Sequence, residues 1–365
     1  MQASSADPAS TAAADLAACR ELLNGGSRTF FAASLLLPPR LRNPAMAIYA
    51  FCRVMDDIVD SDGDGSAAAA GLRERLDRAY AGQPLPSPVD RAFADAVARH
   101  AIPRALPDAM LEGFAWDLAG RRYEDLAELC SYAVRVAGTV GAIMAALIGA
   151  RKPEIVARAC DLGVAMQLTN IARDVGEDAR AGRLYLPLSW LRETGIEPEE
   201  WLVRPVFSEP LGRVVARLLR AAEILYRRAD AGIACLPAGC RPGIRAARLL
   251  YAEIGREIEH VGCDSVSQRA VVPRRRKAQL LSRMLIARST TCGLDVAPLP
   301  QARFLVDAVA ASRPAPSDAA LRSIRWWSPA DRVVWVVDLF AQLERREQFA
   351  EMDGSSPEIG IPAAM

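Results

Sequence analysis

The chain has 365 residues, of which 51% are hydrophobic and 24% are charged, and its formal net charge is +1 at pH 7. This composition excludes a largely disordered chain, and the near-zero charge gives no electrostatic footprint for nucleic acid. The eight cysteines form no C-x-x-C pair, and neither of the two histidines lies in a metal-ligand or catalytic-triad pattern. A reduced, cytosolic setting and a chemistry that does not rely on histidine are therefore expected.

Ala, Leu and Arg dominate the chain, and no segment alternates apolar and polar residues as a strand does, so an all-α fold is predicted. Residues 177–207 are expected to be irregular with short elements. Breaks at Pro, Gly and Asn predict helices, in chain order, at 15–23, 44–60, 66–81, 89–101, 105–119, 125–149, 153–176, 209–235, 241–262 and 274–290. Between the first two, a further segment opens with Ser27 as its N-cap and ends at Pro38-Pro39. We expect a many-helix bundle with a central apolar cavity.

Three regions are predicted along the chain. Residues 1–14 are expected to be a flexible N-terminus, and residues 15–295 a helical catalytic domain. Residues 296–365 form an extension in which prolines mark a linker, residues 328–350 a Trp-rich helix, and the remainder a disordered tail. Two interpretations of the Trp-rich helix stay open: it docks on the main domain, or it touches lipid as an interfacial helix.

No secretory signal is visible, because the N-terminus is rich in Ala and Ser and acidic rather than basic and then apolar. The longest apolar run covers residues 136–150. It is shorter than the roughly 20 residues that a membrane-spanning helix needs. We expect a cytoplasmic protein, with peripheral contact at the inner membrane as a further hypothesis.

Two acidic segments carry most of the chemical information. Residues 49–60 read YAFCRVMDDIVD, and residues 167–178 read QLTNIARDVGED. Positions four apart lie about 40° apart around a helix, so Asp56 and Asp60 share one face. Asn170, Asp174 and Asp178 share another face. Oxygen ligands without His or Cys suit Mg²⁺, which commonly bridges carboxylates to a substrate phosphate. Facing helices of this kind predict a site for a diphosphate ester.

Basic and aromatic residues accompany both acidic segments. Arg28 is placed at a predicted helix start, Arg53 lies three residues before Asp56, and Arg173 precedes Asp174. Arginine side chains bind phosphate oxygens bidentately. The alternative for any one of them is an ordinary surface ion pair. Tyrosines recur near these groups and could stabilise a cation through the ring or relay a proton through the hydroxyl. They are Tyr49, Tyr123, Tyr132, Tyr185 and Tyr251.

With these motifs in place, the chain resembles the squalene/phytoene synthase family, most closely its bacterial phytoene-forming members. The resemblance covers roughly residues 15–290 in order and spacing. The segments that carry it are SRTF at 27–30, the two acidic motifs, Tyr132 with VAGTVG at 136–141, GRLYLP at 182–187, and Leu250-Tyr251 through Gln268-Arg269-Ala270. The family often has two adjacent basic residues where Gln268 and Arg269 stand, which leaves the role of that pair open.

The resemblance implies an isoprenoid-synthase helical fold and head-to-head joining of two geranylgeranyl diphosphates into phytoene, by way of prephytoene diphosphate. It implies Mg²⁺ or Mn²⁺ as cofactor and no NADPH. The implied metal ligands are Asp56, Asp60, Asn170, Asp174 and Asp178, and the implied catalytic residues are Asp56, Asp60, Tyr132, Asp174 and Asp178. The implied diphosphate-binding residues are Ser27, Arg28, Tyr49, Arg53, Gln167, Asn170, Arg173 and Tyr251.

Two alternatives stay open. A squalene, dehydrosqualene or hydroxysqualene synthase would share these motifs and act on farnesyl diphosphate. A more remote alternative is a non-catalytic, membrane-associated assembly factor that keeps the fold. The partners expected besides the diphosphate substrate are a membrane surface and other enzymes of the carotenoid pathway, with no nucleic acid.

Overall fold

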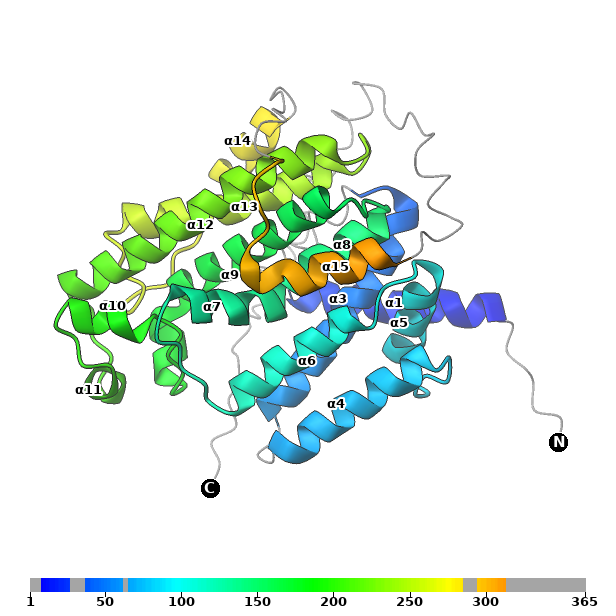
Figure 1. Cartoon of the computed structure of the whole chain (residues 1–365), viewed down its shortest axis with the longest axis horizontal. Helices are drawn as coiled ribbons and strands as arrows, with labels where there is room; N and C mark the ends of the chain where they lie inside the picture. Colours follow the sequence, from blue (N-terminus) through cyan, green and yellow to red (C-terminus); the bar gives the residue numbers. More distant parts are fainter. Residues whose placement is uncertain (1–7, 27–36, 62–64, 285–293, 313–365) are drawn as a thin grey trace, which may run out of the picture. The chain divides into compact units, whose positions relative to one another are not determined.

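The computed structural model describes residues 8–26, 37–61, 65–284 and 294–312, and Figure 1 shows these segments as helices joined by turns. All of them belong to one unit that ends at Ile324. The described residues contain helices and no strand, which confirms the all-α prediction. Ser27, Arg28, the Trp-rich segment 328–350 and the C-terminal tail lie outside the described residues.

The elements follow the order predicted from the sequence, with boundaries shifted by a few residues at most places. They are α1 (Pro8–Gly26), α3 (Pro39–Ser61), α4 (Gly65–Tyr80), α5 (Pro88–Arg99), α6 (Ala105–Leu118), α7 (Leu126–Ala133), the π-helical turn η1 (Val134–Gly138), α8 (Thr139–Ile148), α9 (Pro153–Arg180), α10 (Leu188–Glu193), α11 (Pro198–Val203), α12 (Glu209–Cys235), α13 (Arg241–His260), α14 (Arg274–Met284), the 3₁₀ turn η2 (Pro300–Ala302) and α15 (Arg303–Ala311).

Helix α9 is the centre of the bundle, and it packs against α8, α12, α13 and η1. Two glycines allow the close approach of the preceding hairpin helix. A Cβ on Gly141 would lie 2.1 Å from the carbonyl oxygen of Ala159, and a Cβ on Gly163 would lie 2.1 Å from that of Ala137. Gly141 and Gly163 are therefore needed for this helix packing.

Helices α7, η1 and α8 form one continuous apolar stretch, Leu126–Ile148, that is long enough to cross a membrane. In this fold 61% of its most apolar window is buried inside the unit, as in the core helix of a globular protein. The π-helical turn interrupts the stretch at Val134–Gly138, where the buried Thr139 hydroxyl donates to the Val134 carbonyl at 3.1 Å. Such single π turns often occur at functional sites because they shift the side-chain register.

The described ends of the unit extend the predicted catalytic domain in both directions. Helix α1 already begins at Pro8, and its Asp15 is buried and paired with Arg91. Beyond residue 295, where we expected a linker, η2 and α15 are helical. Helix α15 packs against α6, α8 and α9 and buries Leu305, Val306 and Val309. The described part of the predicted extension is thus packed against the helical unit.

Candidate functional site

A cavity of about 480 Å³ lies among the helices that surround α9. Side chains from α3, α6, α7, η1, α8, α9, α12 and α13 line it. Its volume is within the usual range for sites that bind small molecules. Helix α9 contributes a helical stripe at Ile155, Ala159, Leu162, Gly163, Met166, Gln167 and Asn170.

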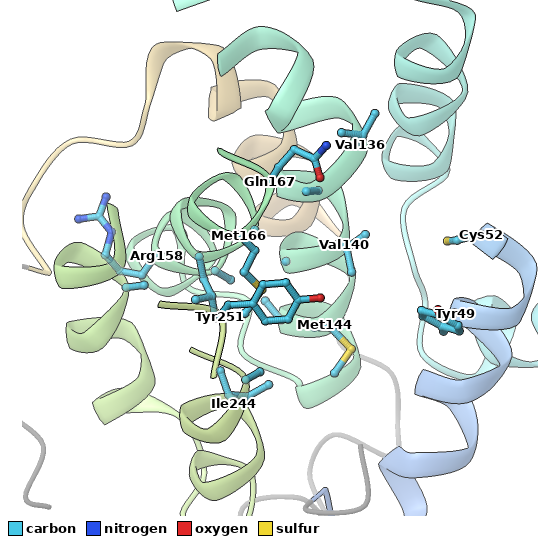
Figure 2. Close-up of a pocket in the computed structure, with 18 of the residues that line it drawn as sticks. Tyr49, Cys52, Val136, Val140, Met144, Arg158, Met166, Gln167, Ile244 and Tyr251 are labelled. Atoms are coloured by element: carbon cyan, nitrogen blue, oxygen red, sulfur yellow. The ribbon is translucent and has the colours of Figure 1, made fainter. Parts of the chain in front are cut away.

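The lining changes from apolar to polar along α9. The stripe begins with aliphatic side chains at Ile155 and ends with the amides of Gln167 and Asn170. Figure 2 shows the same gradient, with Gln167 at one end of the pocket, Ile244 at the other and Tyr251 between them. The guanidinium of Arg158 points away from these side chains in the same view. The cavity is therefore suited to a long apolar molecule that carries a polar group at one end.

The polar end continues beyond Asn170 into the second acidic motif, because Asp174 and Asp178 follow at intervals of four residues on α9. Arg173 binds Asp174 bidentately, at 2.8 Å and 2.6 Å. Arg269 Nε also donates to Asp174 Oδ1 at 2.8 Å, the oxygen that accepts from Arg173 Nε as well. The role of Arg269 was left open by the sequence, and the structure brings it to the predicted ligand set.

The two aspartates of this motif have opposite pKa shifts. Burial alone would raise the pKa of Asp174, but hydrogen bonds from Arg173 and Arg269 outweigh it, so the pKa is lowered. Burial raises the pKa of Asp178 to about 7, and the negative charges of Asp174, Glu177 and Asp117 add to the effect of burial. Burial is thus the main reason that Asp178 has a raised pKa, and Arg183 offsets it only in part.

The first acidic motif lies on α3, and Asp56 and Asp60 fall within this helix. Their side chains lie outside the described residues. Tyr49 and Arg53 lie about two turns and one turn before Asp56 on the same helix, and both line the cavity. Arg53 also pairs with Asp57 at 2.7 Å. The structure thus brings Tyr49 and Arg53 of α3 to the same cavity as Gln167 and Asn170 of α9.

Tyr132 and Tyr251 also line the cavity. The hydroxyl of Tyr132 donates to Asp117 Oδ2 at 2.8 Å, and that of Tyr185 donates to Asp117 Oδ1 at 2.8 Å. Sequence reasoning missed Asp117 as a site residue. An isolated aspartate at the end of a helix gave no signal, because its partners are 15 and 68 residues away.

The donors at the polar end fit a hard divalent cation. Asn170, Asp174 and Asp178 offer oxygen atoms on one face of α9. Burial, and then the negative charges nearby, raise the pKa of Asp178, and a bound cation would favour its ionised form. Among the described side chains, no three His, Cys, Asp or Glu residues converge closely enough to hold a metal by themselves. Oxygen donors of this kind are the ligand type that Mg²⁺ takes in proteins, where water and substrate phosphate complete its coordination.

Residues 23–276 match the family described as Squalene/phytoene synthase. The chain is 50% identical over 319 residues to the phytoene synthase of Cereibacter sphaeroides. The aligned residues make up 83% of this chain and 90% of that protein. It is 48% identical over 308 residues to the phytoene synthase of Rhodobacter capsulatus, and this alignment includes 82% of this chain and 91% of that protein.

Solved structures show the same arrangement of helices. A dehydrosqualene synthase in complex with ligand has a TM-score of 0.69 and 31% identity, over 76% of this chain and 98% of that chain. A squalene synthase from Alicyclobacillus acidocaldarius has a TM-score of 0.64 and 25% identity, over 70% of this chain and 97% of that chain. The matched residues 23–276 include α3 through α13, which supply the cavity described above.

Proposed function

This chain belongs to the squalene/phytoene synthase family, and on that premise we propose that it is a prenyltransferase that makes phytoene. It joins two geranylgeranyl diphosphates head to head, through prephytoene diphosphate, and releases two diphosphates. The 50% identity to a phytoene synthase over most of both chains supports this substrate and product. The observation that carries the proposal is the cavity, which is apolar along most of α9 and ends in amide, carboxylate and arginine groups.

The polar end binds the diphosphate groups. Arg53 and Arg173 provide positive charge that stabilises a departing diphosphate, as arginine forks do elsewhere. The amides of Gln167 and Asn170 can orient the ester oxygen at the cavity mouth. Ser27 and Arg28 are proposed to complete the site from the segment before α3. The hydroxyl of Tyr251, on α13, lies between the two ends.

Asp56 and Asp60 on α3, with Asn170, Asp174 and Asp178 on α9, would hold Mg²⁺ or Mn²⁺. When bound, the metal supplies Lewis-acid stabilisation of the leaving diphosphates. The carboxylate of Asp174 is kept ionised by two arginines and is therefore ready to accept a cation at neutral pH. No NADPH is needed, because the last step of this reaction is a proton loss and not a hydride transfer.

The apolar walls exclude water from the carbocations formed after diphosphate departs. Met144, Ile148, Ile155, Leu236 and Ile244 present only hydrocarbon or thioether to the cavity. Water excluded in this way cannot quench the cation before the second substrate attacks it. The hydroxyl of Tyr132 lies among these walls near the polar end and is placed to assist proton loss.

The product is a long hydrocarbon that water does not dissolve. We therefore propose a cytoplasmic enzyme with peripheral contact at the inner membrane, where later carotenoid-pathway enzymes would take up the product. Flotation of the purified protein with liposomes tests this part. Recovery of the protein with the vesicles supports it, and recovery only in the vesicle-free fraction contradicts it.

Product analysis tests the proposed reaction. The purified protein with Mg²⁺ is given geranylgeranyl or farnesyl diphosphate, each with and without NADPH. The expected result is a forty-carbon hydrocarbon from geranylgeranyl diphosphate, independent of NADPH. The similarity to a dehydrosqualene synthase favours a second candidate, a synthase acting on farnesyl diphosphate. A thirty-carbon product from farnesyl diphosphate alone would establish that candidate, and no product from either substrate would contradict both.

A further inference from the structure

One carboxylate near the polar end of the cavity is shared by two tyrosines. Tyr132, at the end of α7, donates to Asp117 Oδ2, and Tyr185, just before α10, donates to Asp117 Oδ1, each at 2.8 Å. Asp117 itself lies in the last turn of α6. Three elements that are distant in the sequence therefore meet at a single side chain, and each oxygen of that side chain has its own tyrosine donor.

This cluster faces the substrate cavity. Asp117 and Tyr132 both line it, and Tyr132 is otherwise buried, with 4% of its surface exposed. The rings fix the arrangement, because Tyr132 stacks on Tyr185 with centroids 5.2 Å apart and packs against the buried Tyr123 at 5.3 Å. The phenol of Tyr132 is held between the cavity and the Asp117 carboxylate with little freedom to turn away.

The hydrogen bonds have a definite direction. Burial, followed by the negative charge of Asp117, raises the pKa of Tyr132 well above its ordinary value, and the same two causes raise the pKa of Tyr185. Both phenols therefore keep their protons and donate them to the carboxylate. A phenol that donates its single proton still has lone pairs on its oxygen. Tyr132 can consequently accept a proton from the cavity while it passes its own proton to Asp117.

We propose that Asp117 is a positioning residue that receives, through Tyr132, the proton lost when the cyclopropyl intermediate closes. This inference rests on the proposed function. In the step, the electron pair of a C–H bond of the coupled cation forms the new C–C bond of the ring. The proton moves to Tyr132 Oη, and the original Tyr132 proton moves to Asp117 Oδ2. The cation and the carboxylate become a neutral hydrocarbon centre and a neutral carboxylic acid.

A phenol alone could not perform this step in a dry cavity, because accepting a proton would leave a positively charged oxygen without compensation. The carboxylate removes that charge as it forms. Tyr185 has a different role. Its hydroxyl donates to the second oxygen of the Asp117 carboxylate and orients that carboxylate toward Tyr132. Groups placed in this way for proton transfer typically contribute between about 10² and 10⁴ in rate.

The variant Asp117→Asn tests the proposal, because it removes the proton acceptor and keeps the shape of the side chain. In Asp117→Asn, coupling and ionisation remain, but proton loss is slowed. Released diphosphate, forty-carbon hydrocarbon and prenyl alcohols are quantified from the same reaction with geranylgeranyl diphosphate and Mg²⁺. We expect hydrocarbon formation to fall by about 100-fold while diphosphate release falls far less, so that alcohols formed by water capture increase. Equal loss of diphosphate and hydrocarbon, or no loss, would overturn the proposal.

Three further variants separate chemistry from structure. Glu112→Gln removes an exposed carboxylate from the same helix and should leave the product ratio unchanged. Asp117→Glu restores an acid and should recover part of the hydrocarbon yield. If Asp117→Asn does not fold, Tyr132→Phe keeps the carboxylate and should shift the ratio toward alcohol in the same way; an unchanged ratio there overturns the proposal. Absence of hydrocarbon from the wild-type protein would instead contradict the proposed function.

Discussion

Helix α9 carries two carboxylates that are each held between two arginines, and their environments differ sharply. Toward the start of the helix, Asp161 Oδ2 lies 2.8 Å from Arg158 Nε and 3.0 Å from Arg228 Nε. Near its end, Asp174 is bound by Arg173 and Arg269. We refer to the first group (Arg158, Asp161, Arg228) as the inner cluster. The second group (Arg173, Asp174, Arg269) is the outer cluster.

The inner cluster is enclosed. Asp161 is fully buried, and its Oδ1 accepts no hydrogen bond from the described residues. At Asp161 the effect of burial exceeds that of both arginines, so its pKa is raised. At Asp174 the hydrogen bonds and charges of the two arginines exceed the effect of burial, so its pKa is lowered. Arg228 also donates to the Ala297 carbonyl at 2.7 Å, which ties the segment before α15 to the bundle. The inner cluster thus connects α9, α12 and the segment before α15.

The outer cluster is open. The side chain of Arg269 is 55% exposed and that of Asp174 17% exposed, so both can exchange protein partners for ligands. Both clusters show the same sequence feature, an arginine near an aspartate on one helix. In the inner cluster this pair stabilises the fold, and in the outer cluster it belongs to a predicted binding site. Burial, and not the residue types, distinguishes the two.

The largest effect is expected at the inner cluster. Asp161→Asn removes the charge that two arginines share in the interior, and breaking a buried ion pair in this way costs about 3–5 kcal/mol of stability. Urea unfolding measures the change. Asp95→Asn, which disrupts an exposed pair with Arg99, is the matched control and should cost less than about 1 kcal/mol. Equal effects for the two variants would contradict the contrast between buried and exposed pairs.

Next in size is the outer cluster's carboxylate. Asp174→Asn should lower turnover of geranylgeranyl diphosphate by at least about 100-fold, because charge stabilisation at the leaving group is lost. Its unfolding midpoint should stay close to that of the wild-type protein. Steady-state kinetics and thermal unfolding on the same preparation check both statements. Full activity in this variant would show that Asp174 plays no part in the site.

A smaller effect is expected from the arginines that flank the two carboxylates. Arg269→Gln should raise KM for the diphosphate by about tenfold, as loss of a group that orients a ligand often does. Arg228→Gln should leave KM unchanged and lower stability instead. Comparing KM and unfolding midpoint for both variants sharpens the contrast. The interpretation fails if Arg228→Gln alters KM and Arg269→Gln does not.

The smallest effect concerns pH. The pKa of Asp178 is about 7 in the folded chain and about 3.9 for an unperturbed aspartate. The folded state therefore binds this proton more tightly, and stability is lost as pH rises from about 4 to 7. Without divalent cations, Asp178→Asn should melt roughly 2–4 °C above the wild-type protein at pH 8. The difference should shrink as the pH falls toward 4, and a difference independent of pH would contradict the raised pKa.

Much of the acidic motif on α9 could be predicted because its spacing is local. Asn170, Asp174 and Asp178 share a face of any helix, and the predicted helix at 153–176 matches α9 closely. The apolar pattern that predicts a many-helix bundle is also local. Such features depend on the geometry of one helix, which the sequence determines directly.

Other features depend on tertiary contacts. Arg269 reaches Asp174 across 95 residues, and Asp117 meets Tyr185 across 68. The π-helical turn at Val134 has no periodicity of its own in the sequence. Prolines near residue 300 suggested a linker, yet Pro300 begins a 3₁₀ turn that leads into the packed helix α15. In each case the local structure or the pairing depends on contacts with residues that are distant in the sequence.

One binding measurement tests most directly whether the outer cluster is a metal-dependent diphosphate site. A geranylgeranyl diphosphate analogue with sulfur in the bridging position, which ionises poorly, is titrated calorimetrically into the wild-type protein with and without Mg²⁺. Asp174→Asn is titrated in parallel. The predicted result is binding that requires Mg²⁺ and is lost in Asp174→Asn. Binding of equal strength without Mg²⁺, or unchanged in the variant, would contradict the assignment of α9's outer cluster to the diphosphate site.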